Sequence, residues 1–337
     1  MVSTDAGRMR VGLATYRPIT DDLITLLQQI GVQDLLLKPN QYEGVESVMP
    51  LGRVWEVDEL VAIKRSLEEA GIRLHAFEKL PIPIYEILME DDDDERDRKI
   101  SIVEESITNL GEAGISILGY SGHPPHGAVR TDRDHPVRGG ARSTAFIEAD
   151  LTDGDELKYG RQYTESELWG RYENFVRRAV PAAEAADVTL AVHPSDPPIK
   201  EIYGIPLLFR NRENFERALD IVPSDNHGLK FCIGCWSEMG EDVPKVIREL
   251  GDKIVYVHFR DVVGTRGNFY ETFIDDPDSN FEAADLMTAL ADIGFTGVLE
   301  PDHVPMMIGE SEWQFGSTLG RTYTVAYLNG LIDGLYH

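Results

Sequence analysis

The hydrophobic positions of this chain form short, nearly continuous apolar runs, each followed by an amphipathic stretch, and the pair repeats about eight times. The runs are rich in Val, Ile, Leu and Phe and do not alternate strictly with polar residues. This pattern is typical of strands that are covered on both faces. The predicted strands are Arg10–Tyr16, Asp34–Lys38, Arg73–Phe77, Ile115–Gly119, Thr189–Val192, Leu229–Cys232, Ile254–His258 and Gly297–Leu299.

The amphipathic stretches between these runs predict helices, several of which end in a glycine directly before the next strand. Such glycines, at positions 31, 71, 114 and 294, indicate left-handed helix C-caps. The predicted helices are Asp21–Ile30, Val57–Ala70, Arg96–Ala113, Glu165–Ala186, Arg212–Ile221, Val243–Leu250, Phe281–Ile293 and Glu312–Leu335.

Strict alternation of strand and helix predicts a parallel sheet. Eight such units in 337 residues predict closure into one α/β domain, a (β/α)8 TIM barrel spanning residues 1–337. A doubly wound open sheet is the alternative, but no G-x-G-x-x-G motif follows the first predicted strand.

One connection, residues 120–164, is too long for a simple turn and carries Pro, Gly, Asp and Arg with little periodicity. A loop of this length after a barrel strand is usually functional or else disordered, and we interpret it as a cover over the active-site mouth. His123, His126 and His135 lie in this loop. We do not expect them to be metal ligands, because exposed loop histidines without a role are commoner.

Composition narrows the functional classes. Lys and Arg number 32 against 59 Asp and Glu, a net charge of −27, which disfavours nucleic acid as a partner. No apolar run approaches the roughly 20 residues of a membrane span. The polar start of the chain has no apolar signal-peptide core, so we expect a cytoplasmic protein. A homo-oligomer is the default expectation for a barrel that pairs through its outer helices.

The acidic residues are spread along the chain, with one dense cluster at Glu90–Asp94. Dispersed acidity resembles the strongly solvated surfaces of proteins from salt-loving organisms, in which salt screens self-repulsion. On this hypothesis the protein loses stability when molar salt is diluted, and indifference to salt would count against it.

Side chains that bind metals follow the last four predicted strands. They are His193, Cys232 and His258, and the run Glu300-Pro301-Asp302-His303. The C-terminal ends of barrel strands converge on one site, so these side chains are expected to meet. Two imidazoles, a thiol and a carboxylate favour Mn, Fe, Co or Zn over Mg or Ca. About four protein ligands leave positions open for substrate oxygens.

Cys232 and Cys235 are the two cysteines of the chain. Two cysteines exclude a disulfide framework, and a four-thiolate zinc site needs a second pair. A lone C-x-x-C is weak support for redox chemistry, and both residues can equally be ordinary buried side chains.

The residues around these positions resemble the mannonate dehydratase family, barrel enzymes of the xylose isomerase-like group that convert D-mannonate to 2-keto-3-deoxy-D-gluconate. The most specific match is His193-Pro194-Ser195-Asp196-Pro197-Pro198, within a resemblance that covers most of the chain outside the long loop. The other matching segments are Gly52–Trp55, Phe77–Ile82, Phe231–Gly234, His258–Arg260, Pro301–His303 and Gly320–Arg321.

The resemblance implies that the metal ligands are His193, Cys232, His258 and Asp302, that the metal is Mn2+ or Fe2+, and that the substrate is a small sugar acid. The chain departs from the family pattern around the substrate. It has Ser195 where the family has Asp, Glu300 for Arg, Val304 for Gly and Phe315 for Tyr.

Dehydration of a sugar acid requires an acid or base near neutral pH, for which histidine is best suited. His303 is the catalytic candidate, although it can equally hold Asp302 in place. Asp196 can serve as a base partner, support a metal ligand or form a structural turn among the neighbouring prolines. Glu78 can accept a hydrogen bond from a substrate hydroxyl or pair with a Lys or Arg.

A sugar acid also needs local positive charge. The candidates are Arg17, Lys38, Arg130 and Arg260, which fall on predicted strand ends or on the long loop. An Arg can hold a carboxylate through two parallel hydrogen bonds, but each of these residues can also be a surface charge.

Two other functions remain open. One is a metal-dependent sugar isomerase or epimerase of the same barrel group, since fold does not fix the reaction. Carboxylate-rich ligand sets mark many of its members, whereas the thiol of Cys232 favours the dehydratase. The other is a barrel that only binds a sugar acid or a metal, which the departures at Ser195, Glu300 and Phe315 keep open.

Overall fold

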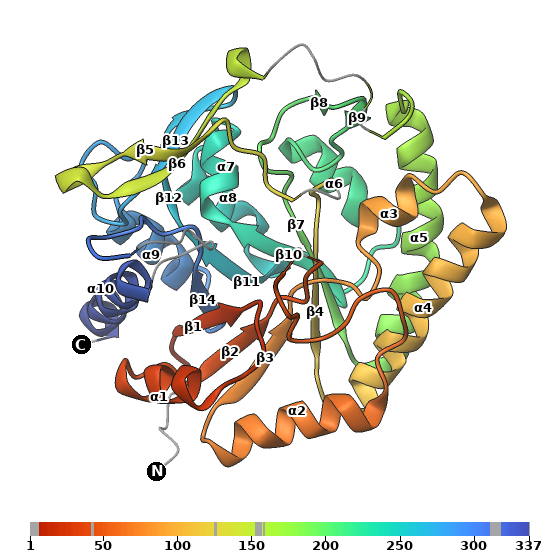
Figure 1. Cartoon of the computed structure of the whole chain (residues 1–337), viewed down its shortest axis with the longest axis horizontal. Helices are drawn as coiled ribbons and strands as arrows, with labels where there is room; N and C mark the ends of the chain where they lie inside the picture. The colour runs from red at the N-terminus through yellow and green to blue at the C-terminus, as the bar shows by residue number, and fades with distance from the viewer. Residues whose placement is uncertain are drawn as a thin grey trace. The chain divides into compact units, whose positions relative to one another are not determined.

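The computed structural model describes residues 7–41, 44–124, 127–151, 157, 159–310 and 318–336. Eight parallel strands form a closed barrel in the order β1-β14-β11-β10-β7-β4-β3-β2, which confirms the predicted fold (Figure 1). Their bounds are β1 Arg10–Thr15, β2 Asp34–Leu37, β3 Arg73–Phe77, β4 Ile117–Ser121, β7 Thr189–His193, β10 His227–Cys232, β11 Ile254–Phe259 and β14 Val298–Pro301.

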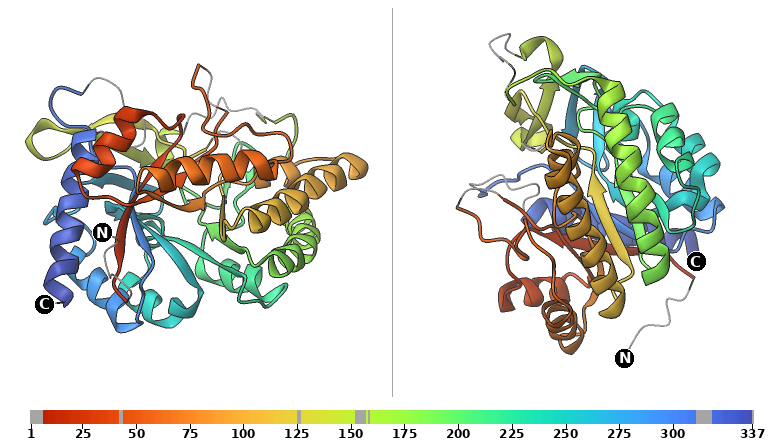
Figure 2. Two further views of the ribbon diagram at one scale, coloured as in Figure 1. Left: turned by 90° about the horizontal axis from the view of Figure 1, so that it is seen from below. Right: turned by 90° about the vertical axis from the view of Figure 1, so that its right-hand side faces the viewer.

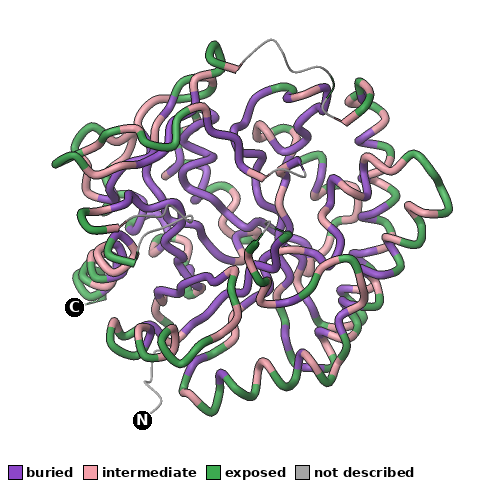
Figure 3. Tube along the Cα trace, in the orientation of Figure 1, coloured by how far each residue is buried: buried purple, intermediate pink, exposed green. Residues whose placement is uncertain are grey.

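The barrel strands are buried on both faces, as their continuous apolar runs predict. All four residues of β2 and all six of β10 are buried. Helices α2, Val57–Glu69, and α4, Asp93–Glu112, in contrast, keep exposed residues along their outer sides (Figure 3).

The eight predicted helices are present within one to three residues of their expected bounds, apart from the start of α10. The bounds are α1 Asp21–Gln29, α2 Val57–Glu69, α4 Asp93–Glu112, α5 Glu165–Ala186, α6 Arg212–Asp220, α8 Val243–Leu250, α9 Ala283–Asp292 and α10 Thr318–Tyr336. The first residues of the last predicted helix, 312–317, lie outside the described residues. The capping glycines 31, 71, 114 and 294 have φ angles of 76°, 77°, 68° and 69°, so the predicted left-handed conformation is confirmed.

Two short helices were not predicted, α3 Ile84–Leu88 and α7 Ile233–Glu238. All of the residues of α7 are buried, so it lacks the polar face by which a helix is recognised in a sequence. Helix α7 begins directly after Cys232, which is its N-cap residue.

The chain divides into two compact units. Unit 1 contains Met1–Gly12, Val129–Leu151 and Phe231–His337, and unit 2 contains Leu13–Ala128 and Thr152–Lys230. Among the described helices, none combines the length and apolar composition needed to cross a membrane.

Within unit 1, much of the long connection is regular structure. It contributes β5, Asp132–Pro136, and β6, Arg142–Ile147, to an antiparallel sheet of order β12-β13-β6-β5. The partner strands are β12, Asp261–Thr265, and β13, Asn268–Thr272. Strand β13 lies between β12 and β6, so its backbone is paired on both sides.

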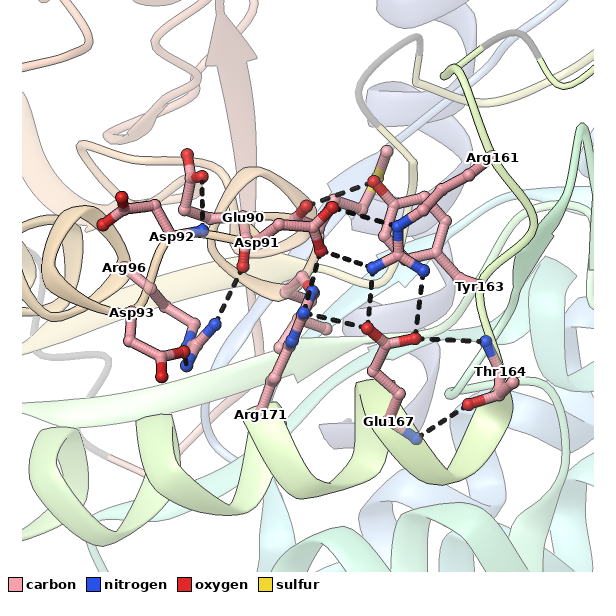
Figure 4. Close-up of polar contacts among 12 residues, drawn as sticks. Glu90, Asp91, Asp92, Asp93, Arg96, Arg161, Tyr163, Thr164, Glu167 and Arg171 are labelled. Carbon is pink, nitrogen blue, oxygen red and sulfur yellow. Dashed lines mark hydrogen bonds and ion pairs between the residues drawn. The ribbon is translucent and has the colours of Figure 1, made fainter.

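Within unit 2, α4 and α5 run side by side (Figures 1 and 2). An ion-pair cluster, drawn in Figure 4, ties the end of the long connection to the corner before α4. Arg161 and Arg171 both contact Asp91 and Glu167, with Arg171 2.9 Å from the Asp91 carboxylate. The hydroxyl of Tyr163 donates to the carbonyl of Met89. Part of the predicted acidic cluster is therefore neutralised by arginines.

Candidate active site

Three of the four implied metal ligands meet within unit 1. Cys232 ends β10, His258 lies in β11, and Asp302 directly follows β14. One ligand atom from each of the three lies within 4.8 Å of the others, and all three residues are buried. β11 and β14 pair directly, with His258 opposite Glu300, and this register fixes the spacing of the imidazole and carboxylate.

The donor set and its spacing fit a divalent metal. Two ligands bonded to one metal at about 2.1 Å lie roughly 3 to 3.5 Å apart, depending on the coordination angle. Nδ1 of His258 lies 3.1 Å from Oδ2 of Asp302. On the other side of the ring, Nε2 of His258 lies 3.4 Å from Oε2 of Glu300. A carboxylate that accepts from the second ring nitrogen is the usual support of a metal-bound histidine.

His193, the fourth implied ligand, lies in unit 2 as the last residue of β7. Its Nδ1 is 2.7 Å from the carbonyl oxygen of Pro194. A carbonyl can only accept, so Nδ1 carries the proton and Nε2 has the lone pair that a metal requires. The ring of His123 packs edge-on against His193 at 5.0 Å. Burial holds the pKa of His123 well below its usual range.

The other loop histidines are placed differently. His135 lies on β5, where its ring is 4.7 Å from that of Tyr270 and its Nδ1 is 3.6 Å from Asp132. His126 lies outside the described residues.

His303, the predicted acid or base, follows Asp302 with a left-handed backbone conformation, φ 48°. Its Nδ1 is 2.6 Å from Oε1 of Glu271, and its Nε2 is 3.7 Å from Oδ2 of Asp302. The two nitrogens of this ring therefore face two different carboxylates of unit 1.

Two of the predicted substrate-binding arginines, Arg130 and Arg260, are buried in unit 1. Arg130 donates to Glu271, Thr144 and the carbonyl of Val129.

Arg260 lies 2.6 Å from Glu238 and 3.3 Å from Glu271. It also donates to the sulfur of Cys235 at 3.2 Å, so this cysteine packs as a buried partner of Arg260. The guanidinium passes so close to Gly234 that an added Cβ would lie 2.7 Å from it. Both arginines thus have protein acceptors.

Lys38 and Glu78, two further site candidates, form a buried pair in unit 2 at 3.0 Å. Each directly follows a barrel strand, and the amide of Glu78 donates to the carbonyl of Leu37. Lys230 of β10 is the second cation on Glu78, at 3.4 Å. Of the two roles expected for Glu78, the structure therefore shows a pairing with lysines.

Lys79 adds a third ammonium group to this lysine cluster. Lys38 and Lys79 lie 5.6 and 5.9 Å from the ring centre of Tyr16. Burial, together with the charges of Lys230 and Lys38, lowers the pKa of Lys79 to about 8. Arg17, the remaining predicted cation, is exposed beyond the end of β1.

Asp196 is buried in unit 2, before a cis peptide bond to Pro197. The preceding Ser195 donates from its hydroxyl to the carbonyl of Gly122 at 2.9 Å. Ser195 thereby joins the His193 segment to the end of β4. The departures at Glu300 and Val304 are also buried, whereas Phe315 lies outside the described residues.

Sequence reasoning missed three groups of this region: Glu271, Lys79 and Lys230. Lys230 had a signal, because it stands two positions before Cys232 and so shares its face of the strand. Lys79 likewise follows Glu78 at a strand end. Glu271 had no such signal, since it lies near the end of β13, a strand outside the barrel.

The comparisons with known proteins point to the same family that the site residues resemble. A model of the D-mannonate dehydratase family matches residues 20–161 and 155–337. A mannonate dehydratase of Oceanobacillus iheyensis is 31% identical, over 85% of this chain and 88% of that protein. One from Enterococcus faecalis is 30% identical, over 84% of this chain and 87% of that protein.

Solved structures similar to this chain also include a mannonate dehydratase. The mannonate dehydratase of Streptococcus suis serotype 2 superposes with a TM-score of 0.85 at 27% identity, covering 98% of this chain and 94% of that chain. An L-ribulose 3-epimerase has a TM-score of 0.58 at 14% identity, covering 97% of this chain and 95% of that one, which shows the shared fold alone. The chain belongs to the D-mannonate dehydratase family, whose members are hydro-lyases.

Proposed function

We propose that the protein dehydrates D-mannonate to 2-keto-3-deoxy-D-gluconate and water at a metal centre held by His193, Cys232, His258 and Asp302. The observation that carries this proposal is the convergence of three buried ligand atoms in unit 1. The names of the relatives supply the substrate.

His193 is proposed as the fourth ligand for two reasons. It ends a strand of the same parallel barrel as Cys232 and His258, and the C-terminal ends of such strands open at one mouth. Its Nδ1 already donates to the carbonyl of Pro194, which leaves the lone pair on Nε2 for a metal.

The proposed metal is Mn2+ or Fe2+, because a mixed set of imidazole, thiolate and carboxylate suits these ions better than Mg2+. When bound, the ion supplies Lewis-acid stabilisation of the charge that develops on the substrate carboxylate.

His303 is the proposed acid or base of the reaction. Dehydration removes the proton on C2, expels the C3 hydroxyl with a proton as water, and leaves an enol that becomes the 2-keto acid. Nε2 of His303 faces Asp302, so it lies beside a proposed metal ligand and can move a proton at the substrate. Asp196 is buried and follows His193 in the run His193-Pro194-Ser195-Asp196. It is the proposed support for this metal ligand.

The lysine cluster of unit 2 is the proposed anchor for the acidic substrate. Lys38, Lys79 and Lys230 place three ammonium groups around Glu78 and Tyr16 in a protein whose overall charge is −27. A local cationic pocket of this kind attracts an anion against the acidic background. Arg17, Arg130 and Arg260 stay weaker candidates for this role, because the first is exposed and the other two have protein acceptors.

A cytoplasmic location is proposed on the chemistry of the cysteines. Cys232 and Cys235 are buried thiols rather than a disulfide pair, and a thiolate ligand persists best in a reducing compartment. Cell fractionation tests this location.

The function is tested by incubating the Mn2+-loaded protein with D-mannonate and following the products by NMR. Formation of a 2-keto-3-deoxy acid supports dehydration, and its loss in Asp302→Asn ties the reaction to the metal site. Isomerised products from neutral aldoses would instead support the isomerase or epimerase alternative. Bound metal without turnover of acids or sugars would support a protein that only binds.

A further inference from the structure

Glu271 lies at the centre of a buried polar network in unit 1 that the proposed reaction leaves unexplained. It is the next-to-last residue of β13 and is fully buried. Its Oε1 lies 2.6 Å from Nδ1 of His303 and 2.5 Å from Nη2 of Arg130. Its Oε2 accepts from the hydroxyl of Thr144.

The carboxylate of Glu271 is ionised. Burial alone raises its pKa, but the charges of Arg130 and Arg260, together with the hydrogen bond from His303, outweigh burial and lower the pKa to about 2. An ionised carboxylate only accepts hydrogen bonds, so every polar neighbour of Glu271 must donate to it.

This requirement decides the tautomer of His303. Oε1 of Glu271 lies 2.6 Å from Nδ1 of His303, and Nη2 of Arg130 lies 3.4 Å from the same nitrogen. Arg130 can only donate, so the longer contact favours a bare Nδ1, while the shorter contact requires a proton there. The charge-assisted bond at 2.6 Å is the stronger interaction, and Nδ1 therefore carries the proton.

The rest of the network holds Glu271 still. Strand β13 is paired on both sides, and Glu271 lies opposite Val262 of β12. Arg130, which precedes β6, donates from Nε to Thr144 at 3.1 Å and from Nη2 to Glu271. Thr144 of β6 donates to the other oxygen of Glu271, so Arg130 and Thr144 together fix this carboxylate. His303 itself lies beyond the end of β14 and has a left-handed backbone conformation, which is uncommon for a residue other than glycine.

We propose that Glu271, held by Arg130 and Thr144, is a positioning residue that fixes the orientation and tautomer of His303 so that its Nε2 faces the reacting substrate. This inference rests on the proposed role of His303 in catalysis. Glu271 itself does not touch the substrate and acts only through the ring.

The kinetic test compares Glu271→Gln with Glu238→Gln in the Mn2+-loaded protein. Glu238 is a matched control, because it is equally buried and its ion pair is with Arg260. We expect Glu271→Gln to lower kcat by about 10- to 100-fold or more, as loss of a histidine-orienting partner does, with KM and metal content changed less than about twofold. We expect Glu238→Gln to lower kcat far less.

Two results would overturn the proposal: an unchanged kcat in Glu271→Gln, or an equal fall in both variants, which would indicate a general effect of losing a buried carboxylate. A second readout needs no turnover. In the 15N-histidine NMR spectrum of the Zn2+-loaded protein, assigned with His303→Gln, His303 should be the Nδ1–H tautomer and should change in Glu271→Gln.

The two readouts separate the failure of this inference from that of the proposed function. An Nδ1–H tautomer that depends on Glu271 in a protein without dehydratase activity would refute the proposed reaction but keep the positioning role. An Nε2–H tautomer in the wild type would refute the positioning role whatever the activity.

Discussion

Nδ1 of His258 lies 3.1 Å from Oδ2 of Asp302, although the two residues are 44 positions apart in the chain. Cys232 completes a buried trio with them. An imidazole, a carboxylate and a thiol at this spacing are separated by the distances that one metal ion would span.

The thiol of Cys232 is expected to be needed for metal binding, whereas that of Cys235 is not. Cys232→Ser replaces a soft thiolate ligand by a hydroxyl, which is a weak ligand for these metals. We expect it to lower the affinity for the metal by at least about tenfold. Cys235→Ser is the matched control, because it removes a second buried thiol whose partner is Arg260. Metal analysis after dialysis checks this, and equal retention in both variants would remove Cys232 from the site.

Substrate affinity is expected to weaken as the pH rises through about 8, the pKa of Lys79. Lys79 is charged below this pH and neutral above it, so its attraction for an anion disappears on the alkaline side. KM for D-mannonate, measured from pH 7 to 9.5, should rise several-fold above pH 8 in the wild type. In Lys79→Met it should be high and flatter across this range. The exposed Lys200→Met is the control, and a wild-type profile in Lys79→Met would contradict the anchoring role.

The same shift predicts a stability change of defined sign. The pKa of Lys79 is lower in the folded protein than its ordinary value of 10.5. Between about pH 8 and 10.5 the unfolded chain binds more protons, so the contribution of Lys79 to stability rises with pH.

Gly122 is expected to tolerate no side chain, because it packs against Phe209 and the backbone of His193. An added Cβ would lie 2.6 Å from Cδ2 of Phe209 and 3.0 Å from the carbonyl oxygen of His193. We expect Gly122→Ala to lower the free energy of unfolding by about 1–3 kcal/mol. Gly170, in α5, has open space at the same position, so Gly170→Ala should raise it by about 0.5–1 kcal/mol. Urea unfolding of both variants measures the difference, and two equal effects would contradict it.

Asp91 is expected to stabilise the fold by a small, pH-dependent amount. Hydrogen bonds from Arg161 and then Arg171 hold its pKa below the usual range. The contribution is therefore present above the unfolded pKa of about 3.9 and is lost as the pH falls through the lower folded value. The side chain is 57% exposed, so we expect Asp91→Asn to cost only about 0.5–1 kcal/mol at neutral pH.

The control for this effect is Asp94→Asn, an exposed change in the first turn of α4. It should cost only a few tenths of a kcal/mol through the helix dipole. Thermal unfolding at pH 7 and pH 3 distinguishes the two, since the deficit of Asp91→Asn should shrink at the lower pH.

The barrel could be predicted because its strands are short apolar runs with a regular spacing. The run Leu35–Leu37 is fully buried, and Gly71 caps α2 as its position predicts. The antiparallel sheet of unit 1 could not be predicted in the same way. The strand Asp132–Pro136 has four polar residues of five and lies mostly exposed, so its sequence is that of a loop.

The strand ends of the barrel pointed to Cys232, His258 and Asp302, since topology alone brings such positions together. The partners of His303 and Arg130 could not be found, because Glu271 reaches them from β13, a strand outside the barrel. Sequence patterns describe one element at a time, whereas a buried ion pair depends on the packing of two.

The most direct test of the proposed centre is anomalous diffraction from crystals of the Mn2+-loaded protein. The account predicts one strong peak within bonding distance of Sγ of Cys232, a ring nitrogen of His258 and a carboxylate oxygen of Asp302, with His193 as the fourth ligand. A peak elsewhere would contradict the proposed centre. So would metal-loaded crystals in which these side chains only form hydrogen bonds with one another.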